Sequence, residues 1–266
     1  MTRLIAEIGW NHMGDLKLAK QMILEAALAG ASVAKFQTWS VSRLKNGPWD
    51  HDGRREIYEK AELTLDDHEE LNEFCKKHSI LFASSVFAKE DVNILLNVTN
   101  KLVKIPSFEA ANKDLIKECI ENFEHVIVST GTCTWDEVKE LSSYLPCNSS
   151  TVMHCVSSYP CEAGRSNLQR IKALKGLFAD VGYSDHVSGI RASQMALEFG
   201  LTFIEKHFTT SNELPGRDNK FAILPEEMHE LSNYINEREQ AMEDLGNDFQ
   251  DIESESRSLY RSRFGG

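Results

Sequence analysis

Short apolar runs rich in β-branched residues alternate with helical patterns eight times along this 266-residue chain. The first run spans residues 4–8, and over residues 15–29 apolar side chains recur at a helical spacing of three and four. Strands separated by helices pair in parallel, because each crossover returns the chain to the same end of the sheet. The alternation therefore predicts an α/β fold built on a parallel sheet.

The other strand and helix pairs follow the same pattern. The predicted strands span residues 33–37, 80–86, 102–105, 126–129, 151–155, 179–183 and 203–207. The predicted helices span residues 65–77, 88–97, 112–122, 134–144, 167–174, 188–199 and 225–245, and Asn112 and Thr134 are expected to cap two of them. Residues 38–63 are polar, and we expect a long loop there, of a kind usually kept for function.

The length of the chain leaves more than one arrangement of these units. A chain of 266 residues suits either two small domains or one barrel of about 250 residues. An open doubly wound sheet also accommodates the pattern. A closed (β/α)8 TIM barrel fits the number of units better and leaves no edge strand. We therefore predict a single α/β domain, a TIM barrel that spans residues 1–266.

The net charge and the hydropathy of the chain argue against two classes of protein, nucleic-acid binders and membrane-spanning proteins. The formal net charge of −12 argues against a general nucleic-acid binder, because such proteins present a basic face. No apolar run approaches the roughly 20 residues that span a membrane. The N-terminal residues resemble a strand rather than a signal peptide, and the six cysteines fit no zinc spacing. We expect a cytoplasmic protein with reduced thiols that binds neither nucleic acid nor membranes.

Polar side chains stand at nearly every predicted strand end, which is where (β/α)8 barrels carry their chemistry. Lys35 and Lys104, among several hydroxyls, predict a cradle for a phosphate or carboxylate, because hydroxyls donate to oxyanions and lysine supplies the charge. For Ser85 and Ser129 the alternative is that each only terminates its strand. The polar strand-end residues are Glu7, Asn11, His12, Lys35, Gln37, Ser84, Ser85, Lys104, Ser107, Glu109, Ser129, Thr130, His154, Ser157, Ser158, Tyr159, Ser184, Asp185, His186, Glu205, Lys206 and His207.

Two histidines follow neighbouring predicted strands and suggest a metal site. His186 and His207 would be adjacent in the barrel. Two neutral imidazoles, with waters and substrate oxygens, make a loose octahedral site for Mn²⁺ or Mg²⁺. Spacing alone supports equally well the alternative that neither histidine binds a metal. Other histidines, such as those at positions 51, 68, 78 and 229, are expected on the surface.

Eight ordered motifs connect these residues to a known family. The runs AEIGWNHMGD, AGASVAKFQT, KIPSFEAAN, VSTGT, HCVSSYP, VGYSDHVSG, IEKHFTT and LPGRDNKF occur in this order. Together they resemble the sialic acid synthase family, including its legionaminic acid, pseudaminic acid and spore-coat polysaccharide relatives. The resemblance covers about residues 4–264. It implies a (β/α)8 barrel that condenses phosphoenolpyruvate with an N-acetylmannosamine-type sugar, giving a nonulosonic (sialic-type) acid and phosphate.

The resemblance also implies a role for each matching residue. Glu7 resembles the acid/base carboxylate beside the reacting carbons, and His186 and His207 resemble the two ligands of a divalent metal, Mn²⁺ or Mg²⁺. The positions that resemble the phosphoenolpyruvate contacts are Lys35, Ser85, Lys104, Ser107, Ser129 and Ser184. The positions that resemble the amino-sugar contacts are Glu109, Ser157, Tyr159 and Asp218.

Three departures from the family pattern bear on the substrate. Ser157 stands where many sialic acid synthases have Asn, which favours the legionaminic, pseudaminic and spore-coat branches. The run KIPSFE replaces the more common KIGSGE and brings Pro106 and Phe108 near the substrate. Family members continue into an antifreeze-like domain that donates an Arg to a partner's site. Residues 254–266 resemble the start of the linker to that domain, so we expect the domain to be absent and a homodimer or a separate antifreeze-like cap chain to compensate.

Two other functions stay open on the sequence. A deoxy-ulosonate phosphate synthase would use phosphoenolpyruvate with a phosphorylated sugar, and Arg165 and Arg217 are the candidates for its second phosphate. A non-catalytic barrel would bind phosphoenolpyruvate or a sugar without turning it over. An enzyme that forms a C–C bond, a phosphoenolpyruvate-dependent transferase, is the leading hypothesis.

Overall fold

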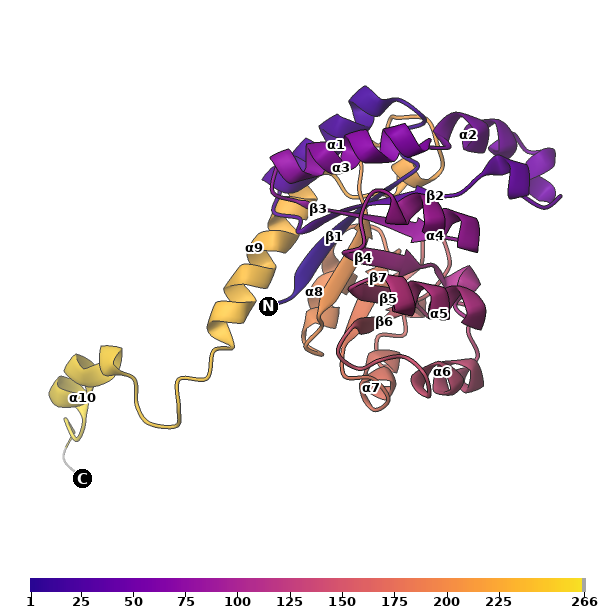
Figure 1. Ribbon diagram of the computed structural model, residues 1–266. Coiled ribbons are helices and arrows are strands. Elements are labelled where there is room, and N and C mark those ends of the chain that lie inside the picture. Colours follow the sequence, from indigo (N-terminus) through magenta and orange to yellow (C-terminus); the bar gives the residue numbers. More distant parts are fainter. Residues whose placement is uncertain (265–266) are drawn as a thin grey trace.

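The computed structural model describes residues 1–264 and is a closed barrel of eight parallel strands in sequence order (Figure 1). This arrangement confirms the predicted TIM barrel. Strand β7 begins and ends two residues later than predicted, so Ser184 and Asp185 lie inside it. The strands are β1 (Arg3–Gly9), β2 (Val33–Thr38), β3 (Leu81–Val86), β4 (Leu102–Ile105), β5 (His125–Ser129), β6 (Ser150–Cys155), β7 (Val181–Asp185) and β8 (Phe203–His207).

Helices cover the outside of the barrel, and their capping follows the sequence. Asn112 accepts a hydrogen bond from the Leu115 N–H, and Thr134 forms a capping box with Glu137, both as predicted. The helices that flank the strands are α1 (Leu16–Leu28), α3 (Leu65–Lys77), α4 (Lys89–Leu96), α5 (Lys113–Asn122), α6 (Trp135–Ser142), α7 (Arg170–Lys175), α8 (Arg191–Leu197) and α9 (Pro225–Ala241).

The prediction of an irregular loop over residues 38–63 is wrong in part. Helix α2 (Arg54–Ala61) lies in this segment, after two short 3₁₀ turns at Val41–Arg43 and Pro48–Asp50. Ala61 is the buried residue of this helix, so no apolar stripe marks it in the sequence. Figure 1 shows α2 projecting beside the strand ends rather than joining the ring of helices.

The inside of the barrel has two layers of opposite chemistry. Apolar side chains fill the end where the strands begin: Ile5, Val33, Ala83, Leu102, Ile127, Met153 and Phe203. Two residues further along the same strands, the side chains that line a cavity are mostly polar: Glu7, Lys35, Ser85, Lys104, Ser129, Cys155 and Glu205. Alternate strand residues point to the same face, so a step of two keeps the inward direction. The apolar layer is therefore the floor beneath the polar one.

One histidine expected on the surface is buried. His68 on α3 is fully buried, and its ring nitrogens lie 2.8 Å from Thr38 Oγ1 and 2.7 Å from the Thr64 carbonyl oxygen. Thr38 Oγ1 in turn lies 2.6 Å from Ser84 Oγ. His68 therefore links α3 to the outer face of β2 and β3, and its polar partners compensate for its burial.

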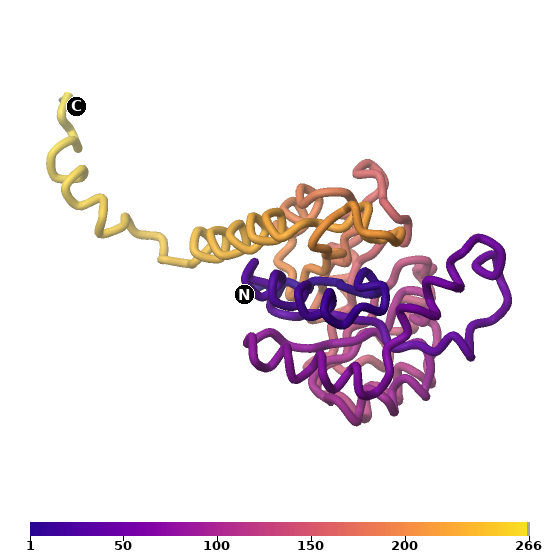
Figure 2. The backbone as a smooth tube through the Cα atoms, turned by 90° about the horizontal axis from the view of Figure 1, so that it is seen from above, coloured from indigo at the N-terminus to yellow at the C-terminus, as the bar shows by residue number. Residues whose placement is uncertain are grey.

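Residues 242–264 extend away from the barrel (Figure 2), and helix α10 (Ser254–Tyr260) has no buried residue. The resemblance of residues 254–266 to a linker, and the cap expected from a homodimer or a separate chain, stay predictions; residues 265 and 266 lie outside the described residues. Within residues 1–264, no helix combines the length and apolar character needed to cross a membrane.

Candidate active site

A cavity of about 550 Å³ opens at the C-terminal ends of the strands. The structure brings together twelve of the thirteen residues predicted for the site, and these line the cavity: Glu7, Lys35, Ser85, Lys104, Ser107, Ser129, Ser157, Tyr159, Ser184, His186, His207 and Asp218. Pro106 and Phe108 also line it, as their place in the KIPSFE run predicts. Glu109 is not among the described lining residues, and its carboxylate accepts a hydrogen bond from the Asn112 side chain at 3.1 Å.

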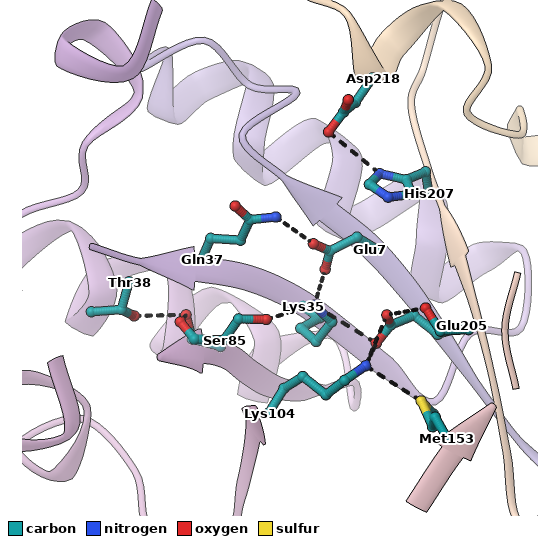
Figure 3. Close-up of polar contacts among 12 residues, drawn as sticks. Glu7, Lys35, Gln37, Thr38, Ser85, Lys104, Met153, Glu205, His207 and Asp218 are labelled. Carbon is teal, nitrogen blue, oxygen red and sulfur yellow. Dashed lines mark hydrogen bonds and ion pairs between the residues drawn. The ribbon is translucent and has the colours of Figure 1, made fainter. Parts of the chain in front are cut away.

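Two lysines and a glutamate form the deepest polar cluster (Figure 3). Lys104 Nζ donates to both carboxylate oxygens of Glu205, at 2.8 and 3.0 Å, and Lys35 Nζ lies 3.7 Å from the same carboxylate. Ser184 Oγ donates to Glu205 at 2.9 Å. Burial favours the protonated acid, but Lys104 and Lys35 outweigh it and hold the pKa of Glu205 well below its ordinary value.

Glu205 lines the cavity and pairs with both lysines, although the sequence analysis assigned it no role. Glu205 stands at the end of a predicted strand, as does Glu109 after β4, so position alone does not separate the two. The signal that separates them is strand periodicity. Glu205 lies two residues after the inward-facing Phe203, whereas Glu109 lies in a 3₁₀ turn beyond the end of β4.

Glu7 lies above this cluster and faces the open cavity. Its carboxylate forms an ion pair with Lys35 and accepts a hydrogen bond from Gln37 Nε2 at 2.8 Å. Burial raises the pKa of Glu7 above its ordinary value, although the ammonium of Lys35 opposes that shift. A carboxyl group whose pKa is raised this way is suited to exchange protons at neutral pH.

Burial and the acidic neighbours act differently on the two lysines. Burial favours a neutral amine, but Glu205 and Glu7 outweigh it and raise the pKa of Lys35. At Lys104 burial prevails over the attraction of Glu205 and lowers the pKa of the ammonium. Both side chains are nearly inaccessible to solvent, at 3% and 2% exposed for Lys35 and Lys104. An anionic ligand placed here would meet cations that water does not screen.

Hydroxyl groups surround the lysines. Lys35 Nζ donates to Ser85 Oγ at 2.9 Å, and the Gly131 N–H donates to Ser107 Oγ at 3.0 Å. Ser129 Oγ is buried and has no hydrogen-bond partner within residues 1–264. A buried hydroxyl without a partner carries a desolvation cost, so Ser129 is poised to donate to a ligand oxygen.

The two predicted metal histidines lie next to each other at one side of the cavity. Their ring centroids are 5.4 Å apart, and the Tyr159 ring lies 4.2 Å from that of His186 and 5.9 Å from that of His207. His186 Nδ1 donates to the Val156 carbonyl at 2.9 Å, which leaves its Nε2 available for a ligand. His207 Nδ1 is buried without a hydrogen-bond partner in the described part of the chain, and Asp218 Oδ2 lies 3.8 Å away (Figure 3).

These side chains fit a divalent metal that takes two ligands from the protein. Burial lowers the pKa of His207 well below its ordinary value, so the ring is neutral, which is the form that binds metals. Across the described residues, no three His, Cys, Asp or Glu side chains lie close enough to hold a metal ion by themselves. Water and substrate oxygens would therefore complete the coordination of Mn²⁺ or Mg²⁺.

A buried ion pair behind the histidines supports them. Asp185 and Lys206 are paired in the register of β7 and β8, and each precedes one of the two histidines. Lys206 Nζ lies 3.2 Å from the Asp185 carboxylate and donates to the Val187 carbonyl at 2.5 Å. Asp185 also accepts hydrogen bonds from the Tyr183 and Ser193 hydroxyls and the Val187 N–H, at 3.0, 2.6 and 2.8 Å. This network fixes the backbone from which both imidazoles project.

Removing the cation of this pair is expected to destabilise the barrel. The Lys206→Met variant keeps the volume of the side chain but leaves the buried Asp185 carboxylate without its ammonium, a change that typically costs about 3–5 kcal/mol. Urea unfolding followed by circular dichroism measures the difference in the free energy of unfolding. The exposed Lys117 on α5 provides the control, since Lys117→Met should change stability by less than about 0.5 kcal/mol. Equal stability of the two variants would contradict this interpretation.

The opening of the cavity is lined by residues from the excursion after β2 and from other loops. Arg54 and Tyr58 come from α2, and Arg217 precedes Asp218 in the loop after β8. Trp10, Phe87 and Phe108 supply aromatic surface, and Phe108 is 63% exposed. Of the two arginines considered for a second phosphate, Arg217 is among the described lining residues and Arg165 is not.

Comparisons with known proteins agree with this geometry. The family model described as "NeuB family" matches residues 22–247. The N,N'-diacetyllegionaminic acid synthase of Campylobacter jejuni is 36% identical over 260 residues, covering 91% of this chain and 78% of that protein. The pseudaminic acid synthase of the same species is 32% identical over 282 residues, covering 98% and 81%. The crystal structure of an N-acetylneuraminic acid synthetase from Leptospira borgpetersenii in complex with citrate has a TM-score of 0.86 and 30% identity, covering 98% and 92%.

Proposed function

The chain belongs to the NeuB family and is an enzyme, and on this premise we propose that it condenses phosphoenolpyruvate with an N-acetylmannosamine-type amino sugar. The products are a nonulosonic acid and phosphate. One observation carries the proposal: a buried anion cradle, a carboxyl group with a raised pKa and a pair of histidines share a single cavity. These are the groups needed to hold an enol phosphate, move protons and activate an aldehyde.

The anionic substrate fits the deep end of the cavity. Phosphoenolpyruvate carries a phosphate and a carboxylate, and Lys35 and Lys104 supply positive charge where water is excluded. The hydroxyls of Ser85, Ser107 and Ser129 line the same cavity and would donate to its oxygens. Ser184 would do so in place of the hydrogen bond that it donates to Glu205. This binding positions the methylene carbon of the substrate below the acceptor sugar.

The reaction adds phosphoenolpyruvate, the sugar aldehyde and water, and releases the acid and phosphate. The methylene carbon of the enol forms a bond to the aldehyde carbon, whose oxygen takes a proton and becomes a hydroxyl. Water then adds to the resulting oxocarbenium carbon and loses one proton, which leaves a hydroxyl group on that carbon. As the C–O bond to phosphate breaks, this hydroxyl becomes the keto group of the acid and its proton passes to the departing phosphate. Glu7 is the carboxyl group that we assign to these proton transfers, and Lys35 and Lys104 stabilise the departing phosphate.

A divalent cation, Mn²⁺ or Mg²⁺, held by His186 and His207 would act as a Lewis acid toward the sugar aldehyde. Tyr159 packs against both imidazoles and limits their rotation. Ser157, Tyr159 and Asp218 lie on this side of the cavity, where the acceptor sugar enters. Burial raises the pKa of Asp218 to about 6, so its carboxyl group can donate or accept a hydrogen bond near neutral pH.

Loss of one histidine is expected to remove the metal. The His207→Ala variant should bind Mn²⁺ at least about 100-fold more weakly, because one of two protein ligands is gone. Electron paramagnetic resonance of free Mn²⁺ measures this affinity without any turnover. His229→Ala, which changes an exposed histidine on α9, is the control and should bind Mn²⁺ as the wild type does. Unchanged affinity in His207→Ala would reject the metal assignment.

Two alternative functions are a non-catalytic binding barrel and a deoxy-ulosonate phosphate synthase. Relatives that cover nearly the whole chain are named synthases, which removes support from a non-catalytic barrel. A deoxy-ulosonate phosphate synthase keeps one of its two candidate cations at the cavity, Arg217. Arg217 Nη2 already donates to the Tyr159 carbonyl at 3.1 Å, so a second phosphate would share this donor. An unphosphorylated amino sugar is therefore the acceptor that we favour.

A panel of acceptors tests the proposed function. The enzyme is incubated with phosphoenolpyruvate, Mn²⁺ and single 2-acetamido sugars, with phosphorylated tetroses and pentoses as the competing class. We expect phosphate release that depends on an N-acetylmannosamine-type sugar. Release that requires a phosphorylated tetrose or pentose would favour the deoxy-ulosonate reaction. Release with none of the acceptors would reject the condensation.

A further inference from the structure

The segment between β2 and α3, residues 39–64, forms part of the cavity opening, and it has no role in the proposed function so far. This segment is called the excursion below. Arg54 and Tyr58 on α2 line the cavity, and Asp52 holds Arg54 in place. We propose that Arg54 and Tyr58 determine which acceptor sugar is used, by contacting the part of the sugar that lies away from its aldehyde, and that Asp52 acts through Arg54 by holding its guanidinium. The inference rests on the proposed condensation and adds to it the residues that set its specificity.

Helix α2 is held firmly against the barrel. The Tyr58 ring lies edge-on to two tryptophans, with centroids 5.7 Å from Trp10 and 6.4 Å from Trp39. Gly14, in the turn after β1, lies against Lys60 near the end of this helix. It has a φ of +81°, and a Cβ built on it would lie 1.8 Å from the Lys60 carbonyl oxygen. The turn after β1 thus contacts the backbone of α2 directly. A surface fixed in this way can discriminate between ligands.

The base of the excursion is also anchored. Arg43 forms an ion pair with Asp91, which is itself buried at the start of α4. The Val41 N–H donates to the Glu62 carboxylate at 2.8 Å, which joins the two ends of the excursion. The side chains on α2 therefore have a defined place relative to the strand ends.

The position of these residues matches the distal part of an acceptor. Lys35, Lys104 and Glu7 lie in the buried part of the cavity, where each is at most 3% exposed. Arg54 is at the opening, where its side chain is 31% exposed. A sugar whose aldehyde approaches Glu7 must extend its remaining carbons toward the opening. Those carbons carry the substituents that differ between amino sugars.

Each of the two arginines at the cavity opening has an acidic residue close to it. Arg54 Nε lies 3.0 and 2.9 Å from the two carboxylate oxygens of Asp52, and Nη2 lies 2.6 Å from one of them. Arg217 is followed directly by Asp218, whose carboxyl group also lines the cavity. A phosphate on the acceptor would have to compete with Asp52 for Arg54. The remaining N–H groups of Arg54 suit a neutral acceptor such as an acylamino carbonyl or a hydroxyl.

Aromatic surface beside the charge pair suits the apolar part of such a substituent. The rings of Trp10, Tyr58 and Phe108 line the same opening. Methyl and C–H groups of an acylated sugar would pack on these rings, while the carbonyl accepts from Arg54. A phosphate gains nothing from such contacts. The pair and the rings therefore select together for a neutral, acylated acceptor.

The first test removes the negative charge from the ion pair between Asp52 and Arg54. Asp52→Asn frees the guanidinium of Arg54, so the ratio of kcat/KM for N-acetylmannosamine 6-phosphate to that for N-acetylmannosamine should rise at least about tenfold. The KM for phosphoenolpyruvate should stay unchanged. Asp50→Asn is the matched control, because Asp50 pairs with Arg55 at 2.6 Å and neither residue lines the described cavity. An equal ratio in Asp52→Asn and wild type would overturn the inference.

The second test removes the contacts themselves. Arg54→Gln removes the guanidinium and Tyr58→Leu removes the aromatic ring, so they should raise the KM for N-acetylmannosamine at least about tenfold and about threefold, respectively. Phosphoenolpyruvate binding, measured by calorimetry, should not change. Arg55→Gln serves as the control and should behave as the wild type. An unchanged sugar KM in Arg54→Gln, or an equal loss of phosphoenolpyruvate affinity, would reject the assignment. Wild type that releases no phosphate with any amino sugar would instead reject the condensation itself.

Discussion

Replacing Glu7 with glutamine should lower kcat by at least about 1,000-fold, because the substitution removes the carboxyl group assigned to proton transfer. The substitution keeps the shape of the side chain and its hydrogen bond with Gln37. It also removes the anion that pairs with Lys35, which leaves that ammonium to Glu205 and to a bound anion. Phosphoenolpyruvate should therefore still bind to the variant.

Two measurements separate these effects. Pre-steady-state turnover reports the chemical step, and calorimetry reports phosphoenolpyruvate binding. The exposed Glu162, which does not line the described cavity, provides the control, and Glu162→Gln should retain wild-type kcat. Turnover in Glu7→Gln within about tenfold of wild type would assign the proton transfers to another group.

Lys104→Met should weaken phosphoenolpyruvate binding at least about 100-fold, because a buried ammonium makes strong hydrogen bonds to an anion. Lys104 is 2% exposed, so no water replaces the lost cation. Lys104 Nζ lies 3.3 Å from Met153 Sδ, and because the methionine side chain is one atom shorter than that of lysine, the variant fits this site without a steric clash. The variant also leaves Glu205 with Lys35 at 3.7 Å and the Ser184 hydroxyl as its partners.

The loss of this pair should also appear in stability. Unfolding of Lys104→Met in the absence of ligand should cost about 3 kcal/mol less than unfolding of the wild type, since one partner of a buried ion pair is missing. Lys101 precedes the same strand and pairs with Glu124 at the surface, so Lys101→Met is the matched control. That control should keep phosphoenolpyruvate affinity. A Lys104→Met protein that binds phosphoenolpyruvate normally would contradict the placement of the anion.

Much of this architecture could be predicted from periodicity. Strands of four to seven residues separated by helices dictate a parallel sheet, and the order of strands around the barrel follows. The inward positions follow as well, because Val33 and Lys35 share one face of β2. Barrel geometry then brings together side chains that lie far apart in the sequence, such as Glu7 and His207, which are register partners across β1 and β8.

The features that could not be predicted from the sequence are those that depend on contacts between distant segments of the chain. Helix α2 has no apolar stripe and is stabilised by Tyr58 packing on Trp10, a contact between distant segments. His68 is buried because Thr38 and Thr64 offer partners to both ring nitrogens, which sequence spacing does not reveal. Glu205 has the same local signature as other strand-end carboxylates. Its place in the site follows from Lys35 on β2 and Lys104 on β4, two strands that do not pair with β8 but direct their ammonium groups toward Glu205 inside the barrel.

Formation of a carbon–carbon bond from phosphoenolpyruvate is the measurement that tests the central claim most directly. Phosphoenolpyruvate labelled with ¹³C at its methylene carbon is incubated with Mn²⁺, the enzyme and the amino sugar selected from the panel. Carbon NMR should show the label coupled to the former aldehyde carbon of a ¹³C-labelled sugar, with one phosphate released for each bond formed. Label that remains in phosphoenolpyruvate, or that appears in pyruvate as phosphate is released, would contradict the proposed condensation.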